Sequence, residues 1–130
     1  MIIGIGIDLC DISRIKKTLN RYGDRFKERC FTESEINKCD RVRNNAACYA
    51  KRFASKEAVS KALGTGINKG VYWKHIEINN MKTGKPRVIL KGKAKIFLNK
   101  MTPKNKKSKI SITITDEKDL AQAVVLIEVI

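Results

Sequence analysis

The chain has 130 residues and a formal net charge of +15 at pH 7, from 28 lysines and arginines against 13 acidic residues. This length suits one folded domain with a real core, which we expect to span residues 1–130. Hydrophobic residues make up 42% of the chain, which excludes a disordered protein. The apolar runs are too short to cross a bilayer and the N-terminus lacks the pattern of a secretion signal, so we expect a cytoplasmic protein.

The positive charge favours polyanionic partners, namely nucleic acid, an acidic protein or a phosphate-rich small molecule. Aromatic residues are only 6% of the chain, and they are not interleaved with basic residues as in single-strand binders. The four cysteines, at positions 10, 30, 39 and 48, form no C-x-x-C pair, and His75 is distant in sequence. We therefore expect no zinc site, four reduced thiols, and a structural or exposed His75.

Residues 2–9 are rich in β-branched side chains and predict a buried strand that ends at Asp8. Gly4 and Gly6 lie inside this strand, and no third glycine opens a helix behind them. They therefore do not match a dinucleotide-binding motif and indicate close backbone approach or tight packing. Asp8 either caps the next helix or binds a metal ion, and the local sequence favours the cap.

Residues 11–22 predict an amphipathic helix. Its apolar stripe consists of Ile12, Ile15 and Leu19. The opposite side is basic, and the basic surface continues beyond the helix, with Arg14, Arg21 and Arg25 among its residues. This surface is either simply solvated or a docking site for an acidic partner, because its charge is nearly one-signed.

A capping box, Thr32 with Glu35 three residues later, predicts the start of a short helix. A longer helix is expected from about residue 45 to residue 63, since alanine, lysine, glutamate and leucine are good helix formers. Gly64 and Gly66 follow it, and glycine readily adopts the left-handed conformation at a helix C-terminus.

Within the long helix, Glu57 and Lys61 stand four residues apart and share a face with Phe53 one turn earlier. Arg52 and Lys56 belong to the adjacent row. A carboxylate and several cations beside a glycine-rich exit suit a metal ion and phosphates. The same residues also suit an ordinary salt bridge on a solvated surface, which the helix alone favours.

The second half of the chain is rich in strands. Its expected elements are a strand at 73–79, a turn at 83–86, a returning strand at 87–90, a helix at 93–100, and final strands at 110–115 and 121–130. Consecutive strands with one long helix, and no regular alternation of strand and helix, predict an α+β domain.

Three separated segments stand out together: Ile-Gly-Ile-Asp-Leu-Cys-Asp-Ile-Ser-Arg at 5–14, Phe-Thr-Glu-Ser-Glu at 31–35, and Arg-Phe-Ala-Ser-Lys-Glu-Ala-Val-Ser-Lys-Ala-Leu-Gly-Thr-Gly at 52–66. In this order they resemble holo-acyl-carrier-protein synthase, the small bacterial type of 4′-phosphopantetheinyl transferase. The Gly-Lys-Pro turn at 84–86 and the Ser-Ile-Thr-Ile-Thr-Asp run at 111–116 fit the same pattern. The resemblance thus covers essentially the whole chain, although each motif alone is weak.

The resemblance implies an α+β fold in which a mostly antiparallel sheet packs against one long central helix, with shorter helices around it. It implies Mg²⁺-dependent transfer of 4′-phosphopantetheine from coenzyme A to a serine of apo acyl carrier protein. The other product is adenosine 3′,5′-bisphosphate, and the pathway is fatty acid biosynthesis. Family members resemble homotrimers with active sites between subunits, and neither nucleic acid nor a membrane is expected as a partner.

The residues of the family's motifs map onto this sequence. Asp8 and Glu57 match the metal carboxylates, Lys61 matches the active-site lysine, and Glu57 is the preferred general base. The expected neighbours of coenzyme A are Arg52, Lys56, Lys61, Gly64 and Pro86. The expected docking residues for the carrier protein are Arg14, Arg21 and Arg25. Thr115-Asp116 stands where many members have a Ser-His pair, so a role of that histidine in holding the nucleotide does not carry over.

Two alternatives come from other classes of protein. A non-enzymatic RNA-binding domain explains the charge but leaves Asp8 and Glu57 without a role. A structural subunit of a larger assembly predicts that Glu57→Gln leaves function unchanged. The enzyme predicts instead that the two carboxylates converge on one hard cation, with the Lys61 ammonium beside it.

Overall fold

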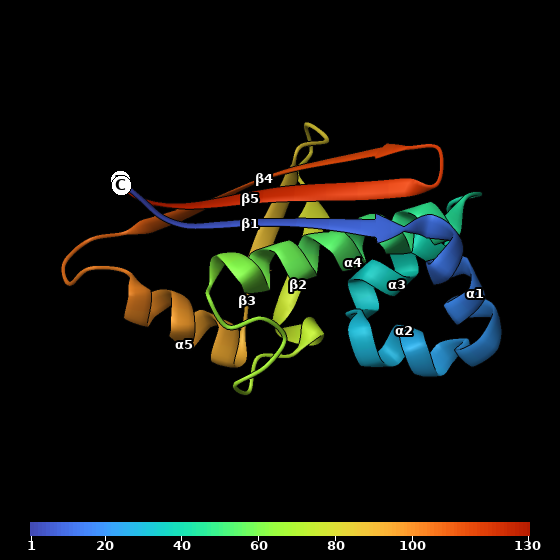
Figure 1. Cartoon of the computed structure of the whole chain (residues 1–130), viewed down its shortest axis with the longest axis horizontal. Helices are drawn as coiled ribbons and strands as arrows, with labels where there is room; N and C mark the ends of the chain where they lie inside the picture. Colours follow the sequence, from blue (N-terminus) through green and yellow to red (C-terminus); the bar gives the residue numbers. More distant parts are fainter.

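The computed structural model describes all 130 residues. At its centre a three-stranded antiparallel sheet lies over one long helix, α4 (Asn45–Ala62) (Figure 1). The strand order is β1-β5-β4. The bounds of these strands are Ile2–Asp11 for β1, Ser108–Glu117 for β4 and Leu120–Val129 for β5. The two termini lie side by side, where the backbone N–H of Val129 donates to the carbonyl of Met1 at 2.8 Å.

Shorter elements surround the two ends of α4 (Figure 1). Around its N-terminal end lie α1 (Ile12–Tyr22), α2 (Asp24–Cys30) and α3 (Glu33–Asp40), and toward the other end lies α5 (Gly92–Met101). A short 3-10 helix, η1 (Trp73–His75), leads into an antiparallel hairpin of β2 (Ile76–Asn80) and β3 (Pro86–Leu90). The predicted α+β fold is confirmed. None of the helices combines the length and the apolar character that a membrane span requires.

Some boundaries differ from the prediction. Residues 73–75 form the 3-10 helix in place of the start of a strand, and His75 accepts a hydrogen bond from the backbone N–H of Tyr72 through Nδ1 at 3.2 Å. The helix α2 was not expected, because its seven residues, Asp-Arg-Phe-Lys-Glu-Arg-Cys, carry only two apolar side chains. The capping box at Thr32 is present as predicted.

The cap of α1 is Asp11 and not Asp8. Oδ1 of Asp11 accepts hydrogen bonds from the backbone N–H of Ser13 at 2.9 Å and from its hydroxyl at 2.6 Å. The bond from the Ser13 hydroxyl is the main reason why the pKa of the Asp11 carboxyl lies below its usual value. Of the two alternatives for Asp8, the cap is therefore wrong, because β1 continues three residues further before the helix begins.

The glycines of β1 allow the strand to lie directly on the backbone of α4. A Cβ atom on Gly6 would overlap the carbonyl oxygen of Ala58, and one on Gly4 would overlap that of Ala62, well inside the 3.0 Å that real Cβ atoms keep. Both helix residues are alanines with little exposure. This confirms the close backbone approach that the glycines predict.

A buried ion pair joins α4 to α3. The ammonium of Lys56 lies 2.7 Å from Oε1 of Glu35, and neither side chain has any exposed surface. Oε2 of Glu35 accepts the backbone N–H of Ile78 at 2.9 Å. Since these residues come from α4, α3 and β2, the pair fixes the hairpin and the short helix against the long one. Burial lowers the pKa of Lys56, and the charge of Glu35 opposes that effect.

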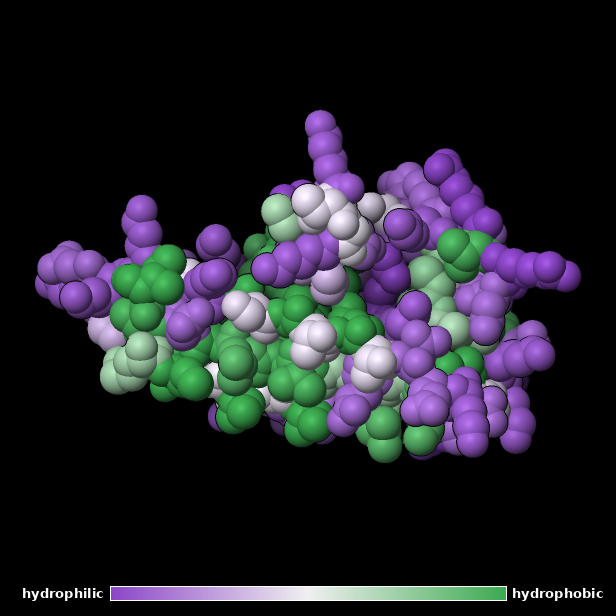
Figure 2. Space-filling model, turned by 90° about the horizontal axis from the view of Figure 1, so that it is seen from above, coloured by the Kyte–Doolittle hydropathy of each residue, from purple (hydrophilic) through white to green (hydrophobic).

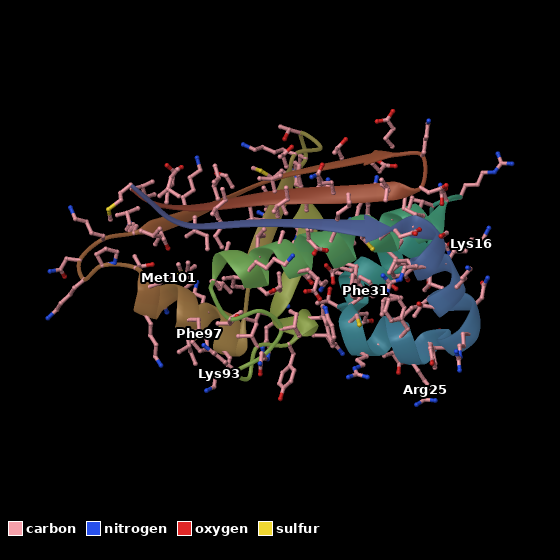
Figure 3. The ribbon with its side chains drawn as sticks, viewed as in Figure 1. Lys16, Arg25, Phe31, Lys93, Phe97 and Met101 are labelled. Atoms are coloured by element: carbon pink, nitrogen blue, oxygen red, sulfur yellow. A yellow bond between two sulfur atoms is a disulfide. The ribbon has the colours of Figure 1, made fainter.

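Aromatic side chains complete the core at this end of the molecule. Phe31 is fully buried between α2 and α4 (Figure 3). Its ring centroid lies 4.8 Å from that of Tyr49 and 5.6 Å from that of Phe26, both with edge-to-face geometry. Such pairs add to the apolar area that the rings bury.

Two of the four cysteines form a disulfide, Cys39–Cys48. The expectation of four reduced thiols is wrong for this pair, because the fold brings the end of α3 against the start of α4. Cys10 and Cys30 are free and buried. Burial is the main cause that raises the pKa of each of these two thiols to about 11.

The outer face of the sheet is open and apolar. Seen from above, hydrophobic side chains extend across it, with hydrophilic residues at its margins (Figure 2). On β1, Ile5 is 66% exposed, Ile7 52% and Leu9 58%. Their partners on β5 include Leu126 and Val124, so the exposed row is continuous across both strands. Three large hydrophobic residues with more than half of their surface in water are unusual for an isolated molecule.

Replacing Gly6 by alanine is expected to destabilise the protein by about 1–3 kcal/mol or more, because the methyl group forces β1 away from α4. Urea denaturation measures the free energy of unfolding. Gly66→Ala is the matched control, since an added Cβ there meets nothing within 4 Å and only the positive φ of +61° opposes it. Equal losses for the two variants would contradict the close approach.

Replacing Lys56 by methionine is expected to cost about 3–5 kcal/mol in urea denaturation, because Glu35 then remains buried without its cation. Lys51→Met is the control on the same helix. Lys51 pairs with Asp116 at 3.6 Å, and both side chains are more than a third exposed, so its loss is expected to cost about 0–1 kcal/mol. A comparably small loss at Lys56 would contradict a structural ion pair.

Candidate active site

The contact between β1 and α4 brings Asp8, Lys61 and Glu57 together. Asp8 lies on the same face of β1 as Gly4 and Gly6, toward the helix. The ammonium of Lys61 donates to Oδ1 of Asp8 at 2.9 Å and to the carbonyl of Ile7 at 3.0 Å. Its side chain is 51% exposed and that of Asp8 is 18% exposed, so this contact is a partly solvated ion pair at the surface of the fold.

Glu57 lies one turn before Lys61 on α4 and accepts a hydrogen bond from the indole N–H of Trp73 at 3.0 Å. Burial raises the pKa of the Glu57 carboxyl above its usual value. The bond from Trp73 opposes that shift, the charge of Asp8 adds to it, and the charge of Lys61 opposes it. The charge of Asp8 thus acts on Glu57, as expected for two acids that lie near each other.

Two carboxylates of this kind suit a magnesium ion. Magnesium takes oxygen ligands, accepts only one or two carboxylates from the protein and fills its octahedron with water and substrate phosphates. No group of three or more histidine, cysteine, aspartate or glutamate side chains is arranged to hold a metal. The donor set of Asp8 and Glu57 therefore fits an open, substrate-completed site and does not fit a closed structural zinc site.

A second feature is a cavity of about 780 Å³ between α4 and the hairpin. Arg52, Asn80, Pro86 and Asp116 are among the residues that line it. This volume is in the range of small-molecule sites. We call it the Arg52 cavity. None of Asp8, Glu57 and Lys61 lines it, so one chain presents the acids and the cavity as separate regions.

Arg52 is one of five charged residues that line the Arg52 cavity. Its Nη1 donates to the Cys48 sulfur at 3.3 Å and its Nη2 to the side-chain oxygen of Asn80 at 3.4 Å. Its Nε is buried and has no hydrogen-bond partner. Burial lowers the pKa of this guanidinium. A buried donor without a partner in a cavity wall suits an anionic ligand.

Lys56 and Gly64 differ in what they offer to a ligand. The ammonium of Lys56 is in the interior, where it binds the Glu35 carboxylate and the carbonyls of Trp73 and Ile76. All three of its donors are used, so in this structure none is directed at a phosphate. Gly64 is exposed just after α4 with φ of +79°, and there is open space beside it.

The three arginines expected at a docking surface are all exposed on α1 and α2. Arg14 also lines a cavity of about 300 Å³ together with Asp8. On the same two helices, Lys16 and Arg25 extend away from the body of the molecule (Figure 3). The basic surface of α1 therefore reaches Asp8 of the candidate site.

Two contributors to these regions were missed in the sequence. The sequence predicts a strand at Trp73, and nothing in the spacing of this residue indicates that its N–H donates to Glu57. In the sequence Asp116 stands out only as a departure from a motif, whereas in the structure it lines the Arg52 cavity and pairs with Lys51. That Trp73 is the one tryptophan of the chain is the only signal that singles it out.

Comparison with known proteins gives a consistent result. Residues 4–124 match the model of the 4′-phosphopantetheinyl transferase superfamily. A holo-[acyl-carrier-protein] synthase of Rhizobium leguminosarum is 55% identical over 128 residues, which cover 98% of this chain and 96% of that protein.

Solved structures agree. The holo-[acyl-carrier-protein] synthase of Neisseria meningitidis superposes with a TM-score of 0.86 and 32% identity, over 98% of this chain and 99% of that one. A holo-(acyl-carrier-protein) synthase from Bacillus anthracis in complex with CoA (3′,5′-ADP) has a TM-score of 0.79 and 36% identity, over 98% and 96% of the two chains. With its fold and its sequence both matched over nearly their whole length, the chain belongs to the holo-[acyl-carrier-protein] synthase family of 4′-phosphopantetheinyl transferases.

Proposed function

We propose that this enzyme transfers 4′-phosphopantetheine from coenzyme A to a serine hydroxyl of apo acyl carrier protein, with magnesium bound at Asp8 and Glu57. The observation that carries the proposal is the Lys61–Asp8 contact of 2.9 Å one helical turn from Glu57. Adenosine 3′,5′-bisphosphate is the expected second product, and the nucleotide in the Bacillus anthracis relative supports it. We assign the reaction to fatty acid biosynthesis in the cytoplasm on the family resemblance.

In this reaction the serine oxygen bonds to the pantetheine phosphorus, the bond from that phosphorus to the bridging oxygen breaks, and the nucleotide leaves with the electron pair. Glu57 is our candidate to accept the serine proton, because its carboxylate lies one helical turn from Lys61 and a single hydrogen bond, from Trp73, is its only contact of this kind with the protein. Bound magnesium would neutralise and orient the diphosphate.

Lys61 has a defined part in this proposal. An ammonium has three donors, and two of them bind Asp8 and the carbonyl of Ile7. The third is free for an oxygen of the leaving phosphate, where negative charge develops during transfer. The bonds to Asp8 and Ile7 hold the side chain in place before substrate arrives, which reduces the entropy lost in binding.

For the nucleotide end of coenzyme A we propose the Arg52 cavity. The buried Nε of Arg52 lacks a partner, and Pro86 lines the same wall. Because the acids do not line this cavity, we propose that a site is completed by a second copy of the chain. The open apolar face of the sheet, with Ile5, Ile7 and Leu9, is the surface we assign to a homotrimer.

The basic surface of α1 and α2 is the proposed docking site for the carrier protein. Arg14, Arg21 and Arg25 are exposed there, and acyl carrier proteins are acidic. Attraction between the two surfaces is expected to raise the association rate and to weaken at high salt. The family is one of enzymes, so the RNA-binding and structural alternatives are set aside.

Asp8→Asn and Glu57→Gln are each expected to lower transfer by at least about 100-fold, because each removes a carboxylate from the reacting centre. Intact-mass analysis of apo acyl carrier protein, incubated with enzyme, magnesium and coenzyme A, measures the transfer. Asp11→Asn is the control, since asparagine caps a helix as well as aspartate. Full activity of the Asp8 or Glu57 variant would overturn the proposal.

Ile5→Glu is expected to convert trimers into monomers and to abolish transfer, because it buries a charge in the proposed interface. Light scattering after size-exclusion chromatography gives the mass of the assembly. Ile96→Glu is the control, since Ile96 on α5 is also exposed, at 46%, but lies away from the sheet face. An active monomer, or a wild-type assembly of other than three chains, would contradict the trimer.

A further inference from the structure

We propose that Trp73 is a positioning residue: its indole N–H holds the Glu57 carboxylate in place, and the buried Lys56 holds Trp73. This inference rests on the proposed function, in which Glu57 contacts the reacting groups. It adds a residue from outside the motifs that carry the family resemblance.

The first observation is the bond itself. Nε1 of Trp73 donates to Oε1 of Glu57 at 3.0 Å, and no other hydrogen bond joins this carboxylate to the protein. A glutamate side chain has several rotatable bonds, and a single bond to one oxygen restricts its orientation. The same arrangement leaves Oε2 without a protein partner and available to a ligand.

The second observation is that two neighbouring side chains pack on the indole ring. Its ring stacks on Phe53, with centroids 5.9 Å apart and an angle of 26° between the planes. Phe53 lies one turn before Glu57 on the same face of α4, so one helix presents both the carboxylate and the platform for its donor. The guanidinium of Arg29 lies over the same indole ring, 5.9 Å from its centroid.

The third observation is that the backbone of Trp73 is clamped from inside the core. Its carbonyl accepts a hydrogen bond from Lys56 Nζ at 3.0 Å, and the Lys56 ammonium is itself held by Glu35 at 2.7 Å. The chain that leads to Trp73 contains three glycines between residues 64 and 70, each with a positive φ angle. The hydrogen bond from the buried ammonium therefore fixes the backbone at Trp73, just after this glycine-rich segment.

These contacts join two neighbouring residues of α4 to the same residue, Trp73. Lys56 and Glu57 are neighbours on α4, and one binds the carbonyl of Trp73 while the other binds its indole. The interior ion pair thereby sets the position of a surface carboxylate. Removing a partner that orients a metal-binding or catalytic side chain in this way typically lowers metal affinity or activity by about 10–100-fold.

Trp73→Phe tests the proposal, because phenylalanine can keep an aromatic ring beside Phe53 but has no N–H donor and is one ring smaller. The expected result is a fall of about 10–100-fold in kcat, with the KM for carrier protein unchanged, and a weaker apparent affinity for Mg²⁺. Tyr72→Phe is the matched control, since the Tyr72 side chain is exposed and contacts neither Glu57 nor Trp73's donor. If Trp73 serves only as packing, Trp73→Phe retains wild-type kcat and Mg²⁺ affinity, and that result would overturn the proposal.

A second measurement does not need the Trp73 variant. Trp73 is the one tryptophan of the chain, so the fluorescence of the wild-type protein reports on this indole alone. Mg²⁺ is added to the protein with coenzyme A present and carrier protein absent. A change in emission that Glu57→Gln abolishes supports the proposal, and an unchanged emission overturns it. Absence of transfer by the wild-type protein would instead refute the proposed function, so the two failures are distinguishable.

Discussion

The structure depends on the contact between β1 and α4 at Gly4 and Gly6. Any side chain there would collide with the carbonyl oxygens of Ala58 and Ala62. Because the two backbones touch, the next inward residue of the strand, Asp8, reaches the last turns of the helix. Lys61 meets it there at 2.9 Å. A small increase in the distance between strand and helix would separate these charges. The close packing of β1 on α4 therefore also sets the geometry of the site.

The buried face of α4 carries a charged side chain, which the composition of the helix does not indicate. Lys56 and Glu35 are both fully buried, and their charges are compensated within the core. Replacing such pairs with apolar residues is often neutral or stabilising in other proteins, so stability alone is a weak reason for keeping one here. The Lys56 ammonium also binds two backbone carbonyls, which gives the pair a role in placing the segment before β2.

Elements with local signals were predictable from the sequence. The start of α3 follows from Thr32 and Glu35, and the end of α4 follows from the glycines at 64 and 66. The two glycines of β1 correctly indicated close approach. Their value as a signal comes from the geometry of glycine itself, which does not depend on the rest of the fold.

Features that need a tertiary partner were not predictable. Helical spacing placed Arg52 and Lys56 in one row, yet Arg52 lines a cavity and Lys56 is in the core. Spacing tells which residues share a face but not how deep that face lies. In the same way, Cys39 and Cys48 pair only because α3 folds back on α4. The meeting of Asp8 with Lys61 spans 53 residues, and only the family resemblance pointed to it.

The alternation of side chains along β1 gives the strand two different faces, one against α4 and one on the open side of the sheet. Inward positions carry small or acidic residues, Gly4, Gly6 and Asp8, and outward positions carry Ile5, Ile7 and Leu9. Since side chains alternate strictly, inserting one residue after Gly6 would exchange the two faces from that point on. The carboxylate would turn to solvent and the aliphatic row would turn against the helix. Only insertions or deletions of an even number of residues would therefore keep both faces of this stretch as they are. Its length is constrained as well as the choice of its residues.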